Sequence, residues 1–294
     1  MEKLHNHNPF LIKRMEDIEI LRKKQKDTPH RHDYYVIIFV ETARGIHHID
    51  FKSYPIQNNT IFFISPEQVH HLEIEGQPMG KVIEFTPEFL ETSKINKTFF
   101  DHLGLFFNCN EVLPLTLPSD EFSNLSYYIR QLEKESAHVQ ILKEEAIGNW
   151  LKLLLIEIKR IKVRIGQENI AIDSNQNRIV GEFKQLVEAQ FKKRHKVNEF
   201  AEQLNITANY LNEVIKSSTG ISAKEMIQNR IILESKRLAI NSENTMKEVA
   251  YQLGFEDIPH FSKFFKNCTG KTFSSFSEEI RKKYNTSDYF DISP

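Results

Sequence analysis

The chain has 294 residues, of which 40% are hydrophobic and 27% charged, so it can build packed cores and is long enough for two domains. The polar first eight residues, and the lack of any apolar run of about 20 residues, predict that the chain has no signal peptide and no membrane span. Its two cysteines, Cys109 and Cys268, argue against a disulfide framework and against a cysteine-based zinc finger, and they favour the reducing cytoplasm as its location.

The overall charge of −1 hides an uneven distribution. Residues 178–285 carry 18 Lys and Arg against 13 Asp and Glu, whereas the rest of the chain carries 21 basic and 27 acidic residues. A basic region of this kind favours a polyanionic partner for the C-terminal third alone. An ordinary solvated surface is the alternative.

Residues 1–118 are predicted to form strands. The runs 34–40 and 60–66 are rich in β-branched and aromatic residues, and 45–51 alternates partly. Asn58-Asn59 favours a turn, because asparagine tolerates the left-handed backbone conformation. Short strands with turns at this spacing predict an all-β barrel or sandwich.

Between residues 119 and 164, the apolar residues recur with the period of an α-helix. The first helix has one apolar stripe, Phe122, Leu125, Ile129 and Leu132, and the second has Ile147, Leu151, Leu154, Ile158 and Ile161. Trp150 and Leu153 widen the second stripe, so this helix must bury more than one side. We therefore expect these two helices to pack on the barrel and to form a homodimer interface.

A polar segment, 165–177, is predicted to be a linker, and 286–294 a tail. Between them the pattern is helical and contains a repeat. Residues 200–206 match 249–255 at an offset of 49, and residues 211–220 match 261–270 at an offset of 50. Each copy reads as a helix, a tight turn and a second helix ending at glycine, which is the layout of a helix-turn-helix.

Local signals support this layout. Gly254 and Asn205 suit turns that need positive φ, and Thr207 and Asp257 are placed to cap the second helices. Capping boxes at 222–225 and 245–248 start a connecting helix and the second copy. A connecting helix of 18 residues would be about 27 Å long. It could therefore place the second helix of each copy in successive major grooves of DNA, which lie about 34 Å apart.

The C-terminal region resembles the DNA-binding domain of AraC/XylS-type transcriptional regulators. The residues that carry this resemblance are Phe200-Ala201, Leu204, Ile206, Tyr210-Leu211, Lys216, Gly220, Arg230, Lys236-Arg237-Leu238, Lys247–Ala250, Leu253–Phe255, Asp257, His260–Lys266 and Thr269-Gly270. Ser235, Phe273 and Ser277 depart from the family pattern. The resemblance implies double-stranded DNA as a partner and RNA polymerase as a candidate partner.

The N-terminal half of the second helix of each helix-turn-helix reaches the base edges of DNA. The residues predicted to contact DNA are Ala208, Asn209, Asn212 and Lys216 in the first copy, and Pro259, His260, Ser262, Lys263 and Lys266 in the second. Asparagine can pair with adenine, and a late lysine more often contacts phosphate. Tyr210, Leu211, Val214 and Ile215, with Phe261, Phe264 and Phe265, are predicted core.

The N-terminal region resembles the cupin-like sensor domain of the same regulators, on the strands above, His30-Arg31-His32 and the segment 66–71. The predicted ligand contacts are His30, His32, Tyr34 and His70. These histidines could instead be surface residues or metal ligands. The carboxylate spacing of metal-binding cupins is absent, so we expect neither a metal nor another cofactor.

The sequence thus predicts a multidomain protein: an N-terminal all-β cupin-like barrel with two packed helices, and a C-terminal all-α domain with two helix-turn-helix motifs joined by a linker helix. The expected function is a sequence-specific transcriptional regulator, not an enzyme, that responds to a small-molecule effector. Two alternatives stay open: a regulator whose barrel only mediates dimerisation, and a metal-dependent cupin enzyme.

Overall fold

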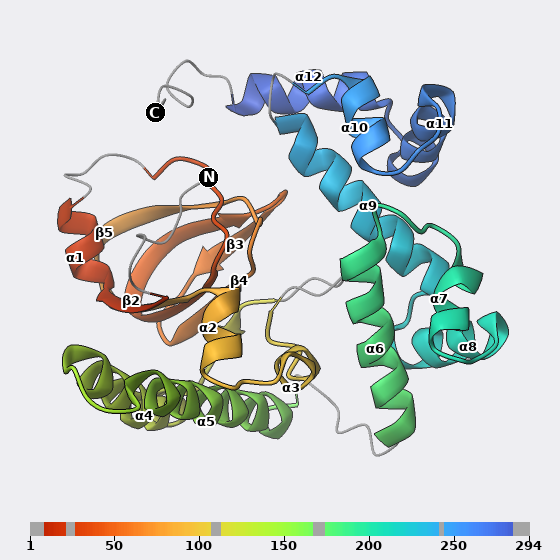
Figure 1. Cartoon of the computed structure of the whole chain (residues 1–294). Helices are drawn as coiled ribbons and strands as arrows, with labels where there is room; N and C mark the ends of the chain where they lie inside the picture. The colour runs from red at the N-terminus through yellow and green to blue at the C-terminus, as the bar shows by residue number, and fades with distance from the viewer. Residues whose placement is uncertain (1–8, 22–26, 107–112, 167–173, 241–243, 285–294) are drawn as a thin grey trace. The chain divides into compact units, whose positions relative to one another are not determined.

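The computed structural model describes residues 9–21, 27–106, 113–166, 174–240 and 244–284 (Figure 1). These residues divide into two compact units, one ending at residue 166 and one beginning at residue 174. Cys109 and the predicted tail, 286–294, lie outside the described residues. Among the described helices, none combines the length and apolar character that a bilayer crossing requires.

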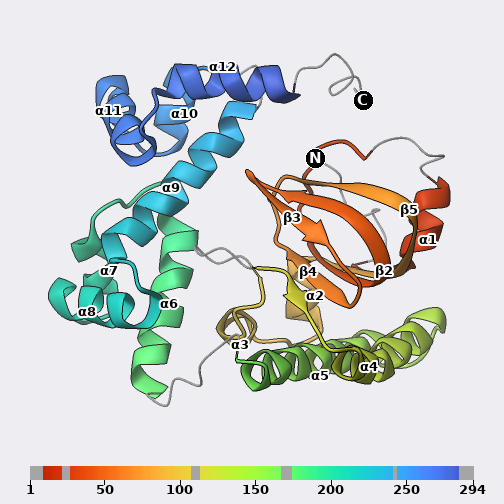
Figure 2. The ribbon, with the colours of Figure 1, turned by 180° about the vertical axis from the view of Figure 1, so that it is seen from behind.

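The N-terminal unit is built on an antiparallel sheet with the strand order β1-β5-β2-β4-β6, and β3 pairs with β2. Its strands are β1 (Phe10–Arg14), β2 (Tyr35–Ile49), β3 (Lys52–Ile56), β4 (Thr60–Ile64), β5 (His70–Phe85) and β6 (Leu115–Thr116). The sheet curls around itself in both views (Figures 1 and 2). The sequence analysis expected separate strands at 34–40 and 45–51, which is wrong. One long strand, β2, spans both runs and adjusts through register shifts between Val40 and Arg44.

Three short helices interrupt the region that the sequence analysis assigned to strands alone. They are α1 (Met15–Leu21), α2 (Pro87–Thr92) and α3 (Lys97–His102). A local signal for α2 was present: the Thr86 hydroxyl accepts the amide of Phe89, and Pro87 occupies the first turn. A helix of this length has too few turns to show the apolar period on which the prediction depended.

Two long helices, α4 (Ser119–Ala137) and α5 (Lys143–Arg164), lie side by side against the sheet, as predicted (Figures 1 and 2). All nine residues of the two predicted stripes are buried, with at most 6% of any of them exposed. They share one core with the sheet, where the rings of Phe39 and Phe122 meet at a centroid distance of 6.4 Å.

The C-terminal unit is helical in all its described regular structure. Its helices are α6 (Ser174–Gln190), α7 (Val197–Gln203), α8 (Ala208–Thr219), α9 (Ala223–Ile240), α10 (Met246–Gln252), α11 (Ile258–Thr269) and α12 (Phe273–Tyr284). Residues 174–177, which the sequence analysis placed in the linker, form the first turn of α6. The predicted 18-residue connecting helix is α9. In both views α8 and α11 lie near opposite ends of α9 and on the same side of it (Figures 1 and 2).

The predicted turn and cap residues act as expected. The side chains of Thr207 and Asp257 accept the amides of Tyr210 and His260 at 3.2 and 2.6 Å. Both capping boxes form. Gly254 has a φ of 78°, and a Cβ there would lie 2.1 Å from the carbonyl oxygen of Lys192. This turn therefore needs glycine for two reasons, its backbone conformation and its close neighbour.

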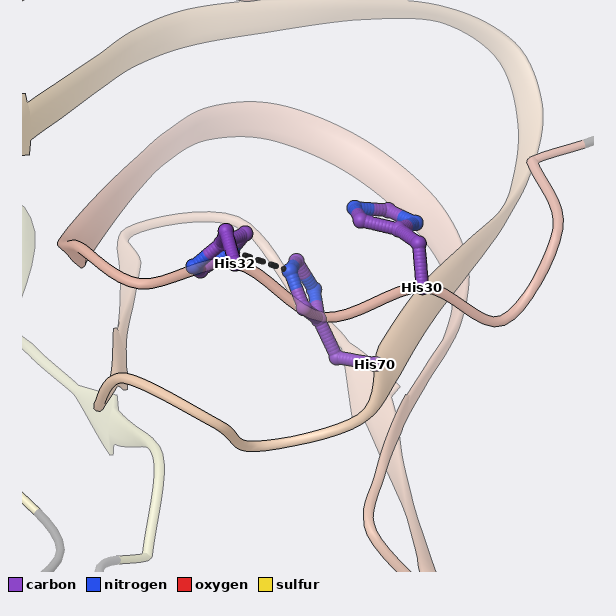
Figure 3. Close-up of side chains that lie close together, drawn as sticks. All are labelled: His30, His32 and His70. Carbon is purple, nitrogen blue, oxygen red and sulfur yellow. Dashed lines mark hydrogen bonds between the residues drawn. The ribbon is translucent and has the colours of Figure 1, made fainter. Parts of the chain in front are cut away.

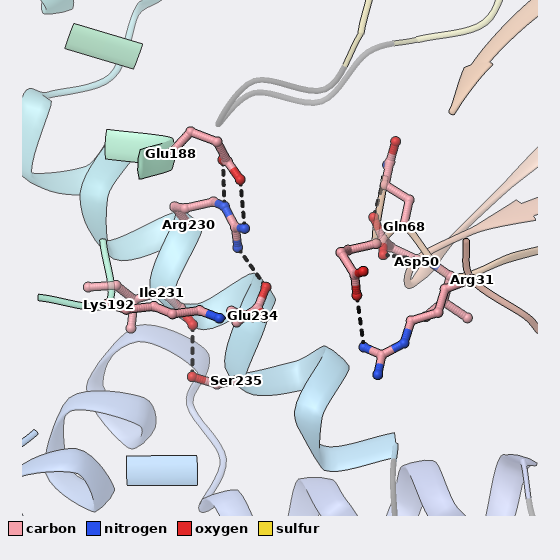
Figure 4. A network of polar contacts seen from close by, with 11 residues as sticks. Arg31, Asp50, Gln68, Glu188, Lys192, Arg230, Ile231, Glu234 and Ser235 are labelled. Carbon is pink, nitrogen blue, oxygen red and sulfur yellow. Dashed lines mark hydrogen bonds and ion pairs between the residues drawn. The ribbon is translucent and has the colours of Figure 1, made fainter. Parts of the chain in front are cut away.

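An ion network around the buried side chains of Arg230 and Glu234 joins α6 to α9 (Figure 4). The Arg230 guanidinium donates two hydrogen bonds to Glu188, at 2.7 and 2.8 Å, and one to Glu234 at 2.9 Å. It also lies 3.8 Å from the ring centroid of Phe191. Burial alone would lower the pKa of Arg230, but the two carboxylates raise it above its ordinary value. One turn further along α9, Ser235 donates to the carbonyl of Ile231 at 2.8 Å.

Candidate functional site

The second helix of each helix-turn-helix carries all the residues predicted to contact DNA. Side chains are exposed at Asn209, Lys216, Pro259, His260, Lys263 and Lys266, and half-buried at Ala208, Asn212 and Ser262. The first four predicted residues share α8, and the other five share α11. The fold therefore gathers them on two helices that are tied to the same connecting helix.

The opposite faces of these helices are buried, with one difference from the prediction. Leu211, Val214 and Ile215 of α8 are at most 1% exposed. Tyr210 was predicted to be core, which is wrong, since it is 38% exposed. Tyr210 precedes the first residue of the 211, 214, 215 stripe and so lies on its flank. Phe264 of α11 is only half-buried and lines the edge of the core.

The two asparagines of α8 have different surroundings. The Asn212 side-chain oxygen accepts the amide of Ala223 at 3.1 Å, so it supports the start of α9. The side chain of Asn209 is exposed. Asn209 is consequently the better placed of the two to present both its amide donor and its acceptor to a base edge.

The two helices that carry the predicted DNA contacts, α8 and α11, are called the reading helices below, and they differ in charge. The exposed residue Glu213 occupies α8 at the position where α11 has the exposed residue Lys263. Lys216 and Lys266 are exposed at matched positions in the last turn of each helix. A phosphate would be attracted to both late lysines, but α11 has the more positive surface.

In the N-terminal unit, the structure brings together the three histidines that the sequence analysis named (Figure 3). His30 and His70 form an antiparallel bridge through their backbones. His32 Nε2 lies 2.9 Å from His70 Nε2, and the ring of Tyr34 stacks on that of His32 at 4.2 Å. His32, Tyr34 and His70 are buried, whereas His30 is half-buried.

A fourth histidine, His47, completes this histidine cluster and was missed by the sequence analysis. It is fully buried on β2, and its Nε2 lies 3.1 Å from His70 Nδ1. The alternation of 45–51 could have revealed it. If Ile49 faces inward, His47 must share that face, because side chains of a strand alternate with a period of two.

The hydrogen bonds determine which ring nitrogen of His32, His70 and His47 carries the proton. The His32 Nδ1–H donates to the carbonyl of Tyr34 at 3.0 Å, so its Nε2 accepts from the Nε2–H of His70. His70 Nδ1 then accepts from the Nε2–H of His47. The three rings thus form two hydrogen bonds with one another while all are neutral. The chain of bonds ends at the buried Nδ1 of His47, which has no hydrogen-bond partner among the described residues.

Burial favours this neutral state. It lowers the pKa of His32 to about 4, and the neighbouring His30 adds to the effect. Burial likewise lowers the pKa of His47 to about 3, with a smaller contribution from His71. Near neutral pH the cluster therefore offers hydrogen-bond donors and acceptors without positive charge on these two rings.

Nitrogen atoms of His30, His32 and His70 lie within 4.8 Å of one another, a spacing from which they could hold a divalent ion. The hydrogen bond between His32 and His70 uses the two Nε2 atoms that such an ion would need. The same atoms could instead contact a small organic molecule. The structure thus brings the predicted contact residues together, and this arrangement is compatible with either a divalent ion or a small organic molecule.

Comparison with known proteins identifies both units. Residues 20–151 match the model of an AraC-like ligand binding domain, and residues 200–279 match that of a helix-turn-helix domain. The two matches together cover most of the chain and include both reading helices and the histidine cluster.

The chain is also similar to individual relatives and to solved structures. The chain is 23% identical over 287 residues to the transcriptional activator RhaR of Mannheimia succiniciproducens, covering 95% of this chain and 96% of RhaR. It is 31% identical over 135 residues to the Msm operon regulatory protein of Streptococcus mutans, covering 46% and 48% of the two chains. The crystal structure of ToxT from Vibrio cholerae covers 92% of this chain and 98% of its own, with 15% identity and a TM-score of 0.40.

The order of domains in the chain, the paired helix-turn-helix units and the two family matches lead to the same assignment. The chain belongs to the AraC/XylS-type family of DNA-binding transcriptional regulators, with an N-terminal cupin-like sheet domain and a C-terminal helical domain.

Proposed function

We propose that this regulator reads a specific DNA sequence with the exposed residues of α8 and α11, and that a small molecule bound at the histidine cluster controls it. The observation that carries the DNA proposal is the pair of exposed reading faces on one rigid support. Residues of both helix-turn-helix units and of α9 belong to a single hydrophobic core.

The connecting helix α9 has a length that suits the spacing of major grooves. An 18-residue helix is about 27 Å long, and one turn of duplex DNA is about 34 Å. Because each reading helix is displaced from the helix axis of α9, the two can reach neighbouring major grooves on one face of the duplex. Selection of bound sequences from a random duplex pool tests this proposal. Enriched sites should contain two short conserved blocks about one helical turn apart.

Replacing Asn209 by alanine should weaken binding to the selected site by about 1–3 kcal/mol, since a bidentate contact to adenine would be lost. Binding to random duplex should change little. Fluorescence anisotropy on both duplexes measures the ratio, with Asn267→Ala, an exposed asparagine at the end of α11, as the control. A wild-type protein that binds both duplexes equally would remove the basis for this prediction.

Replacing Lys266 by alanine should weaken binding to all duplexes alike. A phosphate contact releases about one counterion, so the slope of log affinity against log salt should shrink by about one. Lys97→Ala, an exposed lysine of the N-terminal unit, serves as the control. A slope that matches the wild type would show that Lys266 does not touch the DNA backbone.

The proposed effector contacts are His30, His32, Tyr34 and His70. Support comes from the match of residues 20–151 to a ligand-binding domain model, and from the neutral, hydrogen-bonding character of the cluster. Thermal-shift screening of sugars, bile acids, fatty acids and aromatic acids tests it, because a ligand that binds only the folded state raises the Tm. A hit should lose its effect in His32→Gln. If no compound shifts the wild type, the effector-independent regulator becomes the better description.

We further propose that α4 and α5 pair with a second copy of the chain. Tyr127 and Leu153 are almost half exposed, and the half-buried Trp150 lies beside Tyr127 with ring centroids 5.9 Å apart. Such apolar groups on neighbouring helices favour burial in an interface.

Leu153→Asp should therefore convert a dimer into a monomer in sedimentation equilibrium, because an interface does not accept an unpaired carboxylate. Leu113→Asp, at an exposed leucine outside the helices, is the matched control and should stay dimeric. A monomeric wild type, or a dimeric Leu153→Asp variant, would place the interface elsewhere.

The relatives RhaR and RhaS are named as activators, which supports activation rather than catalysis as the role of this chain. On the same analogy, RNA polymerase is its partner at the promoter and the cytoplasm its location. Reporter transcription in vitro, with and without this protein, distinguishes activation from repression.

A further inference from the structure

A second group of histidines lies on the outer face of the sheet. His48 of β2 is paired directly with His71 of β5 on one side and with Ser53 of β3 on the other. Because His47 and His70 point into the barrel, their neighbours His48 and His71 point outward. Glu73, two residues beyond His71, shares that outer face.

These side chains converge on one point. The Nε2 atoms of His48 and His71 lie 3.7 and 3.8 Å from the same carboxylate oxygen of Glu73. The three ligand atoms all lie within 4.8 Å of one another, and the two imidazole rings stack at 4.3 Å. Ligand atoms around a tetrahedral Zn²⁺ are about 3.4 Å apart, as bond lengths near 2.1 Å require. The two distances to Glu73 are close to that spacing, and the Glu73 side chain, which is 63% exposed, has room to move toward the rings.

His48 is oriented for coordination by a hydrogen bond on its far side. Its Nδ1 lies 2.8 Å from the Ser53 hydroxyl. With the proton on Nδ1, the lone pair is on Nε2, which is shielded from solvent and has no hydrogen-bond partner among the described residues. An outer contact of this kind is what fixes metal-binding histidines in proteins.

We propose that His48, His71 and Glu73 form a binding site for a divalent first-row transition ion on the outer face of the sheet. Two imidazoles and one carboxylate suit zinc, iron, nickel or copper rather than calcium or magnesium. Three protein ligands leave at least one coordination position open to solvent. The site is separate from the histidine cluster inside the barrel and does not depend on the proposed effector.

The ion would connect β2 to β5 beside a functional residue. His71 directly follows His70, which contacts His32 and His47 inside the barrel. Fixing the end of β5 would therefore stabilise the position of His70. Since only the folded chain brings the three ligands together, the ion should also raise the Tm of the N-terminal unit.

Titration of the tag-free full chain with Zn²⁺, followed by calorimetry and by the fluorescence of Trp150, tests the proposal. We expect Glu73→Gln and His48→Gln to lose the affinity almost entirely, and Ser53→Ala to lower it roughly tenfold, as for other outer contacts. His138→Gln, at an exposed histidine just after α4, is the matched control. Circular dichroism checks that each variant folds.

Two results would overturn the proposal. One is a wild-type chain that takes up no Zn²⁺ or Co²⁺. The other is binding that persists in Glu73→Gln and His48→Gln but disappears in His32→Gln, which would place the ion in the histidine cluster. Effector screening repeated in the presence of a chelator tests the histidine cluster without this ion, so failure of this site leaves the proposed regulator function unaffected.

Discussion

Replacing Arg230 by leucine should lower the free energy of unfolding of the C-terminal unit by about 3–5 kcal/mol. The guanidinium is 6% exposed and bridges Glu188 and Glu234. Its removal takes away the hydrogen bond from the guanidinium to the carboxylate of Glu234, which is itself only 11% exposed, and leaves that carboxylate with the smaller attractions of Arg237 and of Lys192 at 3.8 Å. A buried charge that loses its strongest partner is costly, and the contact with Phe191 is lost as well.

The control for Arg230 is another Arg–Glu pair at the same helical spacing. Arg178 and Glu182 lie 2.8 Å apart on α6, but their side chains are well exposed. Arg178→Leu should therefore cost only about 0.5 kcal/mol or less.

Urea unfolding followed by circular dichroism reports the helices of both units, whereas Trp150, the one tryptophan, reports the N-terminal unit alone. A loss seen by circular dichroism but not by Trp150 fluorescence therefore belongs to the C-terminal unit. Equal effects of the two substitutions, or a change confined to the Trp150 signal, would contradict the role given to Arg230.

Acid should destabilise the N-terminal unit well before its carboxylates are protonated. The folded pKa values of His32 and His47 are about 4 and about 3, against an ordinary value of 6.5. Below pH 6.5 the unfolded chain binds protons that the folded chain does not, so stability falls as the pH decreases. The loss continues until the pH reaches the folded pKa values. Between pH 6.5 and pH 5, each ring should lower the stability by about 1.6 kcal/mol.

Urea unfolding at a series of pH values, followed by Trp150 fluorescence in the presence of a chelator, measures this loss. His47→Gln should reduce the slope between pH 6.5 and pH 5, because one of the groups whose pKa is strongly lowered by folding is gone. His138→Gln removes an exposed histidine and should leave the slope unchanged. A wild-type stability that stays constant over this range would mean that the two rings are protonated in the folded state.

Several features of the candidate site could be predicted from the sequence because their signals are local. The repeat of 200–206 at 249–255 locates both helix-turn-helix units, and the caps at Thr207 and Asp257 define where α8 and α11 begin. A cap depends on the three or four residues that follow it, so no knowledge of distant segments is needed. The exposed positions of α8 and α11 then follow from the helical period, apart from Tyr210 at the edge of the buried stripe.

The reading helices, the connecting helix and the apolar faces of α4 and α5 could be predicted from the sequence alone, since each depends on residues a few positions apart. Which histidines meet could not be predicted, because this depends on how distant strands pair. The pairing of β2 with β5 places His47 beside His70 inside the barrel and His48 beside His71 outside it, and a shift of one residue would exchange the two groups. The contact of Arg230 with Glu188 likewise depends on how α6 packs on α9, 42 residues away in the chain. Such partners are chosen by strand register and by helix packing, which the core as a whole sets and which no short stretch of residues encodes.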